Sequence, residues 1–336
     1  MSEDTSLPAM RVWGWSADKG GCQAYRIRFP FAAMKELRPD IVFGFSNIIP
    51  EAARNAANVV VGQRVCNDGP SKLWQKWAKE GEKRLVYELD DDLWNVDPAN
   101  EKAYYFFAKN SVRLNMIRNI QAADAVTVST PELAEMVQHQ TGHKNIHVVP
   151  NAVPAWLLDH EAEKNHHVGW GGSPTHHGDF MLVRRHLAKF LQCNKDAKFH
   201  TIGMDYGKWM KLPESQCHFT KWVPTPEEFF KAIDYRVGIA PLADNTFNSA
   251  KSDIKFLELA ALGIPTIASD VAPYRSIRHE DTGILIRQEH EWTKRLKWTV
   301  DHPDEAAAMG ARGKEYVAAN RTTAHTASLW LKALEG

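Results

Sequence analysis

The chain has 336 residues, 44% of them apolar and 24% charged, which is ordinary for a soluble globular protein and enough for two domains. Lysine plus arginine and aspartate plus glutamate number 41 each, so no overall positive charge marks the chain for nucleic acid or an anionic membrane. The four cysteines form no CxxC pair and no apolar run has membrane length, so we expect a cytoplasmic protein without a zinc knuckle or disulfides.

The first half of the chain alternates short apolar runs with amphipathic segments, which predicts parallel strands joined by helices. The expected strands are residues 10–15, 41–46, 59–65, 85–92, 125–130 and 146–151. One long helix is expected over residues 101–122. A loop with Gly20 and Gly21 follows the first strand and would let the backbone come close to a ligand, although a plain tight turn explains the pair about as well.

A row of lysines occupies residues 71–84. The lysines recur at four- and three-residue spacing, which predicts one cationic helix face, here called the lysine stripe: Lys72, Lys76, Lys79 and Lys83. Gly81 weakens the last helical turn. The stripe is either a solvated face, with the neighbouring tryptophans buried against the sheet, or a contact surface for a phosphate-bearing acceptor or a membrane.

Three consecutive aspartates end the strand expected over residues 85–92. Such a run can hold a divalent metal together with a diphosphate, but the surrounding pattern argues against a metal here. We expect Asp90 or Asp91 to act as a base or to position a hydroxyl group. The remaining aspartates would cap the turn or face solvent.

The second half follows a linker around residues 150–164 and repeats the pattern of the first: apolar strand, glycine pair, helix. Gly171 and Gly172 form that pair, and Ser173 after them is a candidate phosphate ligand or helix cap. His176 and Asp179 lie three residues apart on one helical face, as a functional pair or as a simple interaction at the helix start. Further strands are expected over residues 198–203, 217–222, 237–242, 265–270 and 284–286, and two final helical stretches from residues 289 and 303.

The segment over residues 237–274 reads as a strand, a polar loop, a helix that ends at Gly263, and a second strand. It would carry four polar residues to the carboxyl edge of a parallel sheet, where open α/β sheets bind ligands: Lys251, Ser252, Lys255 and Glu258. Lysines and backbone N–H groups at a helix start suit a phosphate, and a glutamate one turn later suits a sugar hydroxyl. The segment therefore predicts a nucleotide-sugar site.

Taken together, these motifs resemble those of the retaining glycosyltransferases with the GT-B architecture, in particular family four. The resemblance is strongest in the GGSxxHxxD loop and in KSDIKFLELAALGIPTIASD, and weaker in ADAVTVSTPEL, VVPNAV and the first glycine loop. It implies an α/β fold of two facing Rossmann-like domains with a central cleft. The acceptor domain would cover residues 1–152 and the donor domain residues 165–317, with a helix over residues 318–336 packing back on the first domain.

The resemblance also implies roles for individual residues. By position, Glu258 would hold the ribose hydroxyls, Lys251 and Lys255 would face the diphosphate, and the backbone at Trp222 and Val223 would meet the base. The expected donor site also contains Gly20, Gly21, Gly171, Gly172, Ser173 and Ser252, and the candidate catalytic residues are Asp90, Asp91 and His176. Lysines can neutralise a leaving diphosphate, so no metal and no cofactor besides the nucleotide-sugar co-substrate is expected.

Two positions depart from the family pattern. Ala250 stands where the first of two glutamates is usual, and ELDDD stands where a catalytic histidine of the first domain is usual. The expected activity is transfer of a sugar from a UDP- or GDP-sugar with retention, and the alternatives are a sugar-nucleotide 2-epimerase or a non-catalytic nucleotide-sugar binding module. The expected acceptor is a glycan, a glycoconjugate or a hydroxymethylated phage DNA base, and the lysine stripe would favour a polyanion such as modified DNA or a lipid-phosphate surface.

Overall fold

The computed structural model describes residues 10–336, and the chain divides into two compact units. Unit 1 comprises Met1–Val96, of which residues 1–9 lie outside the described part, together with Lys102–Asn151 and Thr323–Gly336. Unit 2 comprises Asp97–Glu101 and Ala152–Thr322. Among residues 10–336, no helix is both long and apolar enough to cross a membrane.

Unit 1 is built on a parallel sheet of six strands in the order β2-β1-β3-β4-β5-β6. The strands are β1 (Arg11–Trp15), β2 (Val42–Ser46), β3 (Val59–Gln63), β4 (Arg84–Leu89), β5 (Ala125–Val128) and β6 (Ile146–Val148). Strands β3, β4 and β5 are almost wholly buried, as expected for central parallel strands covered on both faces by helices. This double burial is why their sequences are nearly continuous apolar runs.

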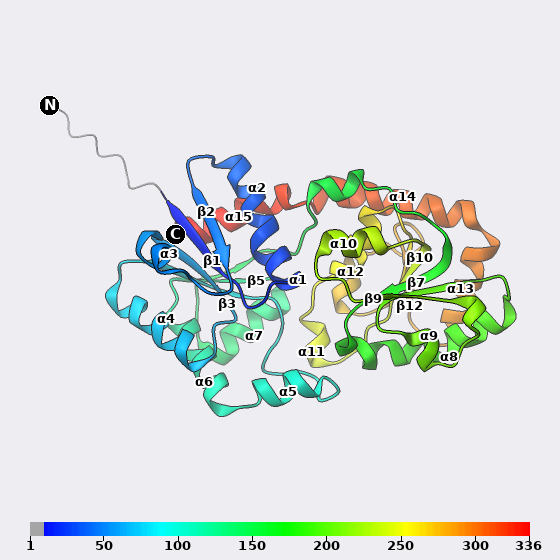
Figure 1. The fold of residues 1–336 in the computed structure, drawn as a ribbon, viewed down its shortest axis with the longest axis horizontal. Helices are drawn as coiled ribbons and strands as arrows, with labels where there is room; N and C mark the ends of the chain where they lie inside the picture. Colours follow the sequence, from blue (N-terminus) through cyan, green and yellow to red (C-terminus); the bar gives the residue numbers. More distant parts are fainter. Residues whose placement is uncertain (1–9) are drawn as a thin grey trace. The chain divides into compact units, whose positions relative to one another are not determined.

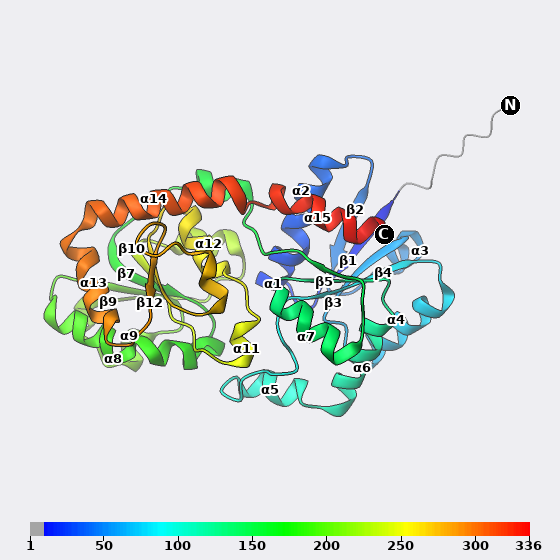
Figure 2. The same ribbon diagram turned by 180° about the vertical axis from the view of Figure 1, so that it is seen from behind.

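The first helical segment of unit 1 consists of α1 (Gly21–Gln23), a π-helical turn η1 (Ala24–Arg28) and α2 (Phe29–Leu37). The other helices are α3 (Glu51–Ala56), α4 (Asp68–Glu80), α5 (Glu101–Phe107), α6 (Asn110–Gln121), α7 (Pro131–Thr141) and α15 (Thr323–Glu335). The C-terminal helix α15 lies beside α2, so the two ends of the described chain meet in one core around Ile27, Phe31 and Trp330 (Figure 1). On the same unit, α6 lies beside α4 and α7 (Figure 2).

The single helix expected over residues 101–122 is two helices, α5 and α6, because the backbone turns at residues 108–109. Lys109 is extended, with φ −65° and ψ 129°, so the helical hydrogen bonds cannot continue through it. The Arg113 side chain donates from Nε to the Phe107 carbonyl at 3.0 Å, which satisfies an acceptor at the end of α5. The prediction of one helix was therefore wrong at the break.

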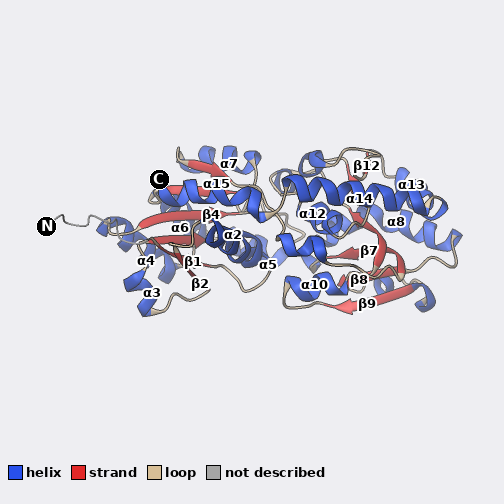
Figure 3. Cartoon of the chain, turned by 90° about the horizontal axis from the view of Figure 1, so that it is seen from above, coloured by secondary structure: helices blue, strands red, loops and turns tan. Residues whose placement is uncertain are grey.

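Unit 2 is also built on six parallel strands, in the order β12-β11-β10-β7-β8-β9. The strands are β7 (His166–Gly171), β8 (Phe199–Gly203), β9 (Cys217–Lys221), β10 (Tyr235–Ala240), β11 (Thr266–Ser269) and β12 (Ile284–Ile286). In both units the strands are flanked by helices (Figure 3). The main core of unit 2 gathers around Trp170, Phe180, Phe199 and Trp292.

The longer helices of unit 2 are α8 (His177–Cys193), α10 (Pro226–Ala232), α12 (Ile254–Ala261), α13 (Glu291–Asp301) and α14 (Pro303–Asn320). Shorter turns are η2 (Ala155–Asp159), η3 (Pro174–His176), α9 (Tyr206–Trp209), η4 (Glu214–Gln216), α11 (Thr246–Ser249) and η5 (Ala272–Ser276). Gly263 has φ 65° just after α12, the left-handed conformation that ends a helix, as the sequence predicts. Three helices finish the chain, and the last of them, α15, begins at Thr323 after α14 ends at Asn320.

Each sheet contains one point where the strand order reverses. In unit 1 the chain leaves β1 toward β2 and returns to β3 on the other side of β1, and in unit 2 it returns to β10 on the other side of β7. Loops that follow two such neighbouring strands lead to opposite sides of the sheet and leave room for a ligand at its carboxyl edge. The loops after β1 and β3, and after β7 and β10, are therefore where a site is expected.

Candidate active site

Lys255 is the cation at the reversal point of unit 2. It extends from α12 to the end of β7, where its Nζ donates to the Gly171 carbonyl at 2.7 Å and lies 5.3 Å from the Trp170 ring centroid. A Cβ atom at Gly172 would lie 3.0 Å from this Nζ and 2.8 Å from the Trp170 ring, so a glycine is needed for the lysine to lie there. Burial lowers the pKa of Lys255, against the opposing effect of Glu258. An anion bound here would favour the charged form of the lysine.

His176 and Asp179 form the second part of the site. His176 Nδ1 lies 3.0 Å from one Asp179 oxygen, and the other oxygen accepts hydrogen bonds from Ala243 N–H at 3.0 Å and Asn248 Nδ2 at 2.9 Å. Burial, and then the nearby Lys255 charge, lower the pKa of His176 to about 4, so the imidazole is neutral at pH 7. An ionised Asp179 only accepts, so we assign the proton to Nδ1, which leaves Nε2 as an acceptor.

The pKa of Asp179 is lowered although burial acts to raise it, because His176 and the Ala243 N–H donate to the carboxylate. Ala243 follows β10 and Asp179 belongs to α8, so this carboxylate joins the two loops that flank the reversal point. The His–Asp pair of the sequence is therefore more than a local contact at the helix start. It orients the imidazole at the carboxyl edge of the sheet.

An aromatic face borders the same loop. Gly203 ends β8 with φ 97°, and a Cβ atom there would lie 2.3 Å from the Gly172 carbonyl oxygen and 3.0 Å from the Trp222 ring. The glycine thus lets Trp222 approach the Gly172 loop. The Trp222 side chain is 57% exposed, and Val223 follows it as a partly buried residue. An exposed indole beside a cationic loop is suited to stacking on a nucleobase.

The remaining donor residues lie on or near the same elements. Lys251 Nζ lies 4.4 Å from the Phe247 ring centroid, and Ser252 follows it just before α12. Glu258 is partly buried one turn beyond Lys255, close enough to act on the pKa of that lysine. Ser173 is in the loop after β7, with its Oγ 2.5 Å from Thr175 Oγ1. Unit 2 therefore holds the predicted donor residues other than Gly20 and Gly21.

Two predicted residues of unit 1, Gly20 and Gly21, follow β1 at the reversal point, whereas Asp90 and Asp91 follow β4. Asp18 Oδ1 accepts from the Gly20 N–H at 2.8 Å, and Gly21 begins α1, so this glycine pair forms a side-chain-capped turn. Asp90 is paired with Arg64, with 3.0 Å between Nε and Oδ1. Asp91 is partly buried beside it.

The third aspartate of the run has the structural role considered for it. Asp92 is buried, and its carboxylate accepts from Trp94 N–H at 3.2 Å and Asn95 Nδ2 at 2.7 Å. These bonds close the turn after β4. Asp92 thus forms hydrogen bonds within its own turn, whereas Asp90 pairs with Arg64 at the end of the neighbouring strand β3.

Several residues at these edges have no signal in the sequence. Arg64 follows β3 with φ 50°, a conformation uncommon for a residue other than glycine and often found at functional sites. Behind it, Arg26 in the π-helical turn pairs with Glu88 at 2.6 Å, both fully buried, and Gln63 Nε2 donates to the other Glu88 oxygen at 3.0 Å. In unit 2, Asp253 accepts from both terminal nitrogens of Arg321, at 2.9 and 2.7 Å, and so anchors the start of α12.

Burial raises the pKa of Glu88 to about 7, against the effect of Arg26. Arg26 also donates to the Val149 carbonyl at 2.6 Å and to Asn151 Oδ1 at 2.9 Å. The pair therefore connects the glycine-loop helix, β4 and the segment after β6. Long sequence separations among these partners explain why no local motif indicates them.

The lysine stripe is shorter than expected. Helix α4 ends at Glu80 because Gly81 adopts the left-handed conformation, φ 67° and ψ 12°. Lys83 therefore leaves the row and donates from Nζ to the Ala57 carbonyl at 2.6 Å. The prediction that four lysines share one helical face was wrong for Lys83.

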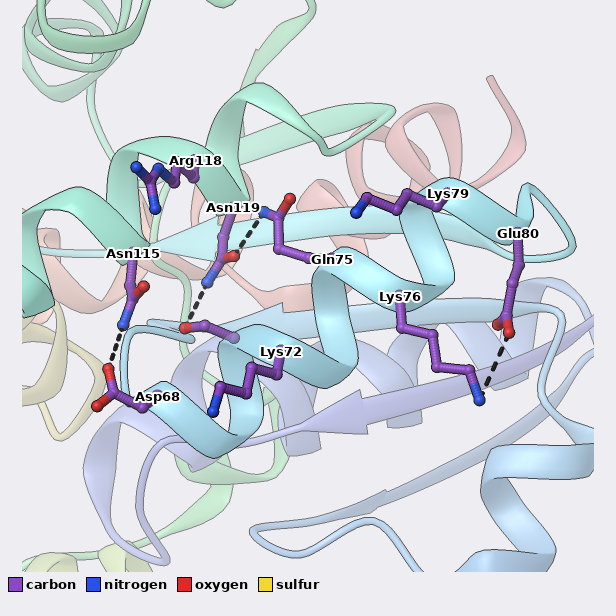
Figure 4. Close-up of a pocket in the computed structure, with 10 residues that line it drawn as sticks. Asp68, Lys72, Gln75, Lys76, Lys79, Glu80, Asn115, Arg118 and Asn119 are labelled. Atoms are coloured by element: carbon purple, nitrogen blue, oxygen red, sulfur yellow. Dashed lines mark hydrogen bonds and ion pairs between the residues drawn. The ribbon is translucent and has the colours of Figure 1, made fainter.

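A groove of about 630 Å³ lies between α4 and α6 (Figure 4). Its cations are Lys72, Lys76, Lys79 and Arg118, and its acids are Asp68 and Glu80, so four positive charges less two negative ones leave an excess of two. Lys76 is 3.5 Å from Glu80 and thus partly neutralised. The floor is polar and ordered, since Gln75 donates to Asn119 Oδ1 and Asn119 donates to Ser71 Oγ, each at 2.9 Å.

The chain matches one family model and many solved structures. Residues 184–332 match the family model described as glycosyl transferase-like, whereas no curated protein sequence matches the chain. Sucrose-phosphate synthase from Thermosynechococcus elongatus has a similar structure, with a TM-score of 0.65 at 12% identity over 96% of this chain and 98% of that one. For Anabaena HepE in complex with UDP-glucose the TM-score is 0.66 at 12% identity, over 97% and 99%.

TarM is a longer relative. The chain matches it with a TM-score of 0.59 at 16% identity over 90% of its own residues, but spans only 58% of the TarM chain. Identities this low establish the fold, whereas the match over residues 184–332 includes α12 with Lys255 and Glu258. The two six-stranded parallel sheets thus form a GT-B fold, and residues 184–332 of the chain match a glycosyl transferase-like family.

Proposed function

We propose that the enzyme transfers a sugar from a nucleotide-diphosphate sugar, UDP- or GDP-linked, which binds at the reversal point of unit 2. The observation that carries this proposal is Lys255, a partly buried cation held on the Gly171 carbonyl beside the His176–Asp179 pair. Solved structures with a similar fold support the class of donor: HepE is in complex with UDP-glucose, and a TarM mutant from S. aureus is in complex with UDP.

In this proposal the diphosphate is bound by Lys255 and Lys251, with backbone N–H groups of the Gly172–Ser173 loop and the Ser252 hydroxyl as further donors. Glu258 accepts from the ribose hydroxyls, and the Trp222–Val223 segment contacts the base. The negative charge on the diphosphate grows as its bond to the sugar breaks, and a prearranged lysine stabilises that charge. No divalent metal is required for this role.

The neutral His176 is proposed to accept a hydrogen bond at Nε2 from a hydroxyl of the donor sugar, with Asp179 keeping the ring in place. The acceptor hydroxyl attacks the anomeric carbon on the face from which the diphosphate leaves, so the configuration is retained. We propose that an aspartate after β4 accepts the proton of the acceptor hydroxyl. Asp90, which is paired with Arg64, and Asp91 beside it are the two candidates.

The acceptor is proposed to carry several negative charges and to contact the groove between α4 and α6. Helix α4 is about 20 Å long at a rise of about 1.5 Å per residue, so its lysines can contact more than one phosphate. The polar floor of Gln75 and Asn119 supplies hydrogen-bond donors and acceptors beside the cations. A phosphate-bearing glycoconjugate, a lipid-phosphate surface and modified DNA share this chemistry.

The donor site is tested by calorimetric titration of UDP-glucose and GDP-mannose into Lys255→Ala and Glu258→Ala. Each variant is expected to bind the preferred donor more than tenfold more weakly, because losing a hydrogen bond to a charged group costs about 1.5–3 kcal/mol. Lys297→Ala is the matched control, since this exposed lysine pairs with Asp301 on α13. Unchanged affinity in both variants, with folding intact, would refute the donor assignment.

Incubation of the protein with labelled donor alone separates the proposed transfer from its alternatives. A 2-epimerase would convert the sugar without an acceptor, whereas a transferase would leave it intact apart from slow hydrolysis. A binding module would neither convert the donor nor transfer its sugar to any acceptor. Turnover that needs an added acceptor is the expected result.

A further inference from the structure

Three metal-ligand side chains meet at the amino edge of the unit 2 sheet. His166 begins β7, His200 is the second residue of β8, and Asp234 directly precedes β10. The Nδ1 atoms of His166 and His200 lie 2.8 and 2.5 Å from the same Asp234 oxygen. The three ligand atoms lie within 4.8 Å of one another. This edge is the opposite end of the strands from Gly171 and Gly203, so the cluster is separate from the donor site.

A third imidazole, His218, and the ring of Tyr235 lie beside the cluster. The His218 ring, from β9, is exposed and lies 4.9 Å from the His166 ring and 4.6 Å from the His200 ring, between centroids. Tyr235 contacts the His200 ring edge-on at 5.9 Å. The cluster thus draws on four strands that are neighbours in the sheet, in the order β10-β7-β8-β9.

We propose that this cluster binds one divalent transition metal ion, with zinc as the best fit. Its ligands would be His166 Nδ1, His200 Nδ1 and Asp234 Oδ1, with His218 able to rotate in as the fourth. Imidazole and carboxylate are ligands that zinc prefers, and three histidines with one aspartate match its coordination number of four. The sheet itself holds the ligands together, so little ordering is needed on binding.

The spacing of the ligand atoms is compatible with an ion. Zinc bonds of about 2.0–2.2 Å in a tetrahedron place neighbouring ligand atoms about 3.3 Å apart. The present 2.5 and 2.8 Å separations therefore need to widen by less than about 1 Å. Asp234 lies in the loop before β10, with its side chain 19% exposed, so it can move by this amount. His166 is 13% exposed and marks the side from which an ion would enter.

The hydrogen bond at the second ring nitrogen of His200 is also compatible with metal binding at the first. Its Nε2 lies 2.9 Å from Thr220 Oγ1. When a metal binds at Nδ1, the imidazole proton resides on Nε2 and donates to this hydroxyl, and such outer hydrogen bonds orient metal-binding histidines. In the absence of an ion the same distances describe two N–H groups donating to one carboxylate. A metal site predicts one bound ion per chain in a titration, whereas a cluster held only by hydrogen bonds predicts none.

The test is titration of chelator-treated full-length protein with Zn²⁺ by calorimetry and with Co²⁺ by visible absorption. We expect one site per chain and the intense absorption bands of tetrahedral Co²⁺. Asp234→Asn and His166→Asn should each weaken binding by roughly a hundredfold or more, since even an outer partner typically contributes 10–100-fold. Thr220→Val should weaken binding by about 10–100-fold, and His218→Asn, which removes the proposed fourth ligand, by at least as much.

The chain has 15 histidines, so a control for adventitious binding is needed. His290→Asn removes an exposed histidine of the same unit and should leave the Co²⁺ spectrum and the Zn²⁺ affinity unchanged. The proposal is overturned if wild-type protein shows no stoichiometric site, or if Asp234→Asn binds as well as the control. His166→Asn and Asp234→Asn carry the test because both side chains are partly exposed, and zinc should raise the melting temperature of wild type but not of these variants.

Discussion

At the scale of single residues, the neutral His176 links the candidate site to pH. The pKa of this imidazole is about 4 in the folded protein, against 6.5 for an unperturbed histidine, because burial and the Lys255 charge disfavour its protonated form. Between pH 6.5 and pH 4 the unfolded state therefore binds more protons than the folded state. By linkage, stability is lost as the pH falls through this window.

We expect His176→Asn to flatten this pH dependence. Between pH 7 and pH 4.5, wild type should lose on the order of 1–3 kcal/mol more of its unfolding free energy than the variant, as measured by urea unfolding. His290→Asn, at an exposed histidine, should behave like wild type. Equal slopes in wild type and His176→Asn would mean that this imidazole is not held neutral by the fold.

Asp179 shows how one residue joins separate parts of the site. Its two oxygens accept from His176, from the backbone of Ala243 and from Asn248, so a single carboxylate orients the imidazole and holds the loop after β10. The pairing with His176 could be suspected from a spacing of three residues. The bonds to Ala243 and Asn248 could not, because they span more than 60 residues and depend on β7 and β10 being neighbours.

At the scale of elements, α4 is the clearest test of the acceptor proposal. Replacing Lys72, Lys79 and Arg118 by glutamine should reduce the slope of log affinity against log salt for a polyanion by about 2–3, since each phosphate contact releases counterions. The probes are a duplex DNA oligonucleotide and vesicles containing phosphatidylserine. Donor affinity should not change, because these residues lie in unit 1.

The matched control is a triple variant at exposed lysines outside the groove, Lys102→Gln, Lys144→Gln and Lys195→Gln, which alters the net charge equally. If both triple variants weaken polyanion binding to the same extent, the effect is one of net charge and the groove has no special role. If salt does not affect binding by wild type, the α4 lysines form an ordinary solvated face with no role in acceptor binding. The effect of the groove variant on DNA and on vesicles identifies which polyanion it contacts.

The end of α4 also shows why the lysine stripe was only partly predictable. Spacing correctly placed Lys72, Lys76 and Lys79 on one helix, because a helical period needs only local information. Gly81 was recognised as a weak point, and its left-handed conformation ends the helix before Lys83. Lys83 then finds the Ala57 carbonyl, an acceptor that precedes β3.

At the scale of the whole molecule, the proposed donor site and the proposed zinc site are independent of each other. Charge on the diphosphate is assigned to lysines at the carboxyl edge of the unit 2 sheet, and the zinc site is assigned to the amino edge of the same sheet. Turnover at a temperature well below unfolding should therefore survive a chelator, although the chelator should lower the melting temperature. Activity and melting curves measured on the same chelated sample check both statements.

A different metal dependence would change the assignment of the aspartate run. If a chelator abolishes turnover of folded protein and Mg²⁺ or Mn²⁺ restores it while Zn²⁺ does not, Asp90 and Asp91 should be reread as a metal site. The ion pair of Asp90 with Arg64 argues for the metal-free alternative, because a guanidinium already balances one carboxylate there.

By itself the sequence determined the alternation of strands and helices, the α/β fold and the approximate limits of most elements, because apolar periodicity and helix-end signals are local. Gly263, which ends α12, is an example that the sequence predicts. The sequence also indicated His176 through the GGSxxHxxD loop, and Lys255 and Glu258 through the motif KSDIKFLELAALGIPTIASD. The break between α5 and α6, where Lys109 is extended and Arg113 donates to the Phe107 carbonyl, was missed.

Only the tertiary structure decided which polar groups meet. Strand order in a parallel sheet is set by long crossovers, so His166, His200 and Asp234 come together although they are 34 and 68 residues apart. The same order places Arg64 against Asp90 and Arg26 against Glu88. A buried charge must find a partner wherever the fold provides one, and that choice is made by the sheet rather than by neighbours in the chain.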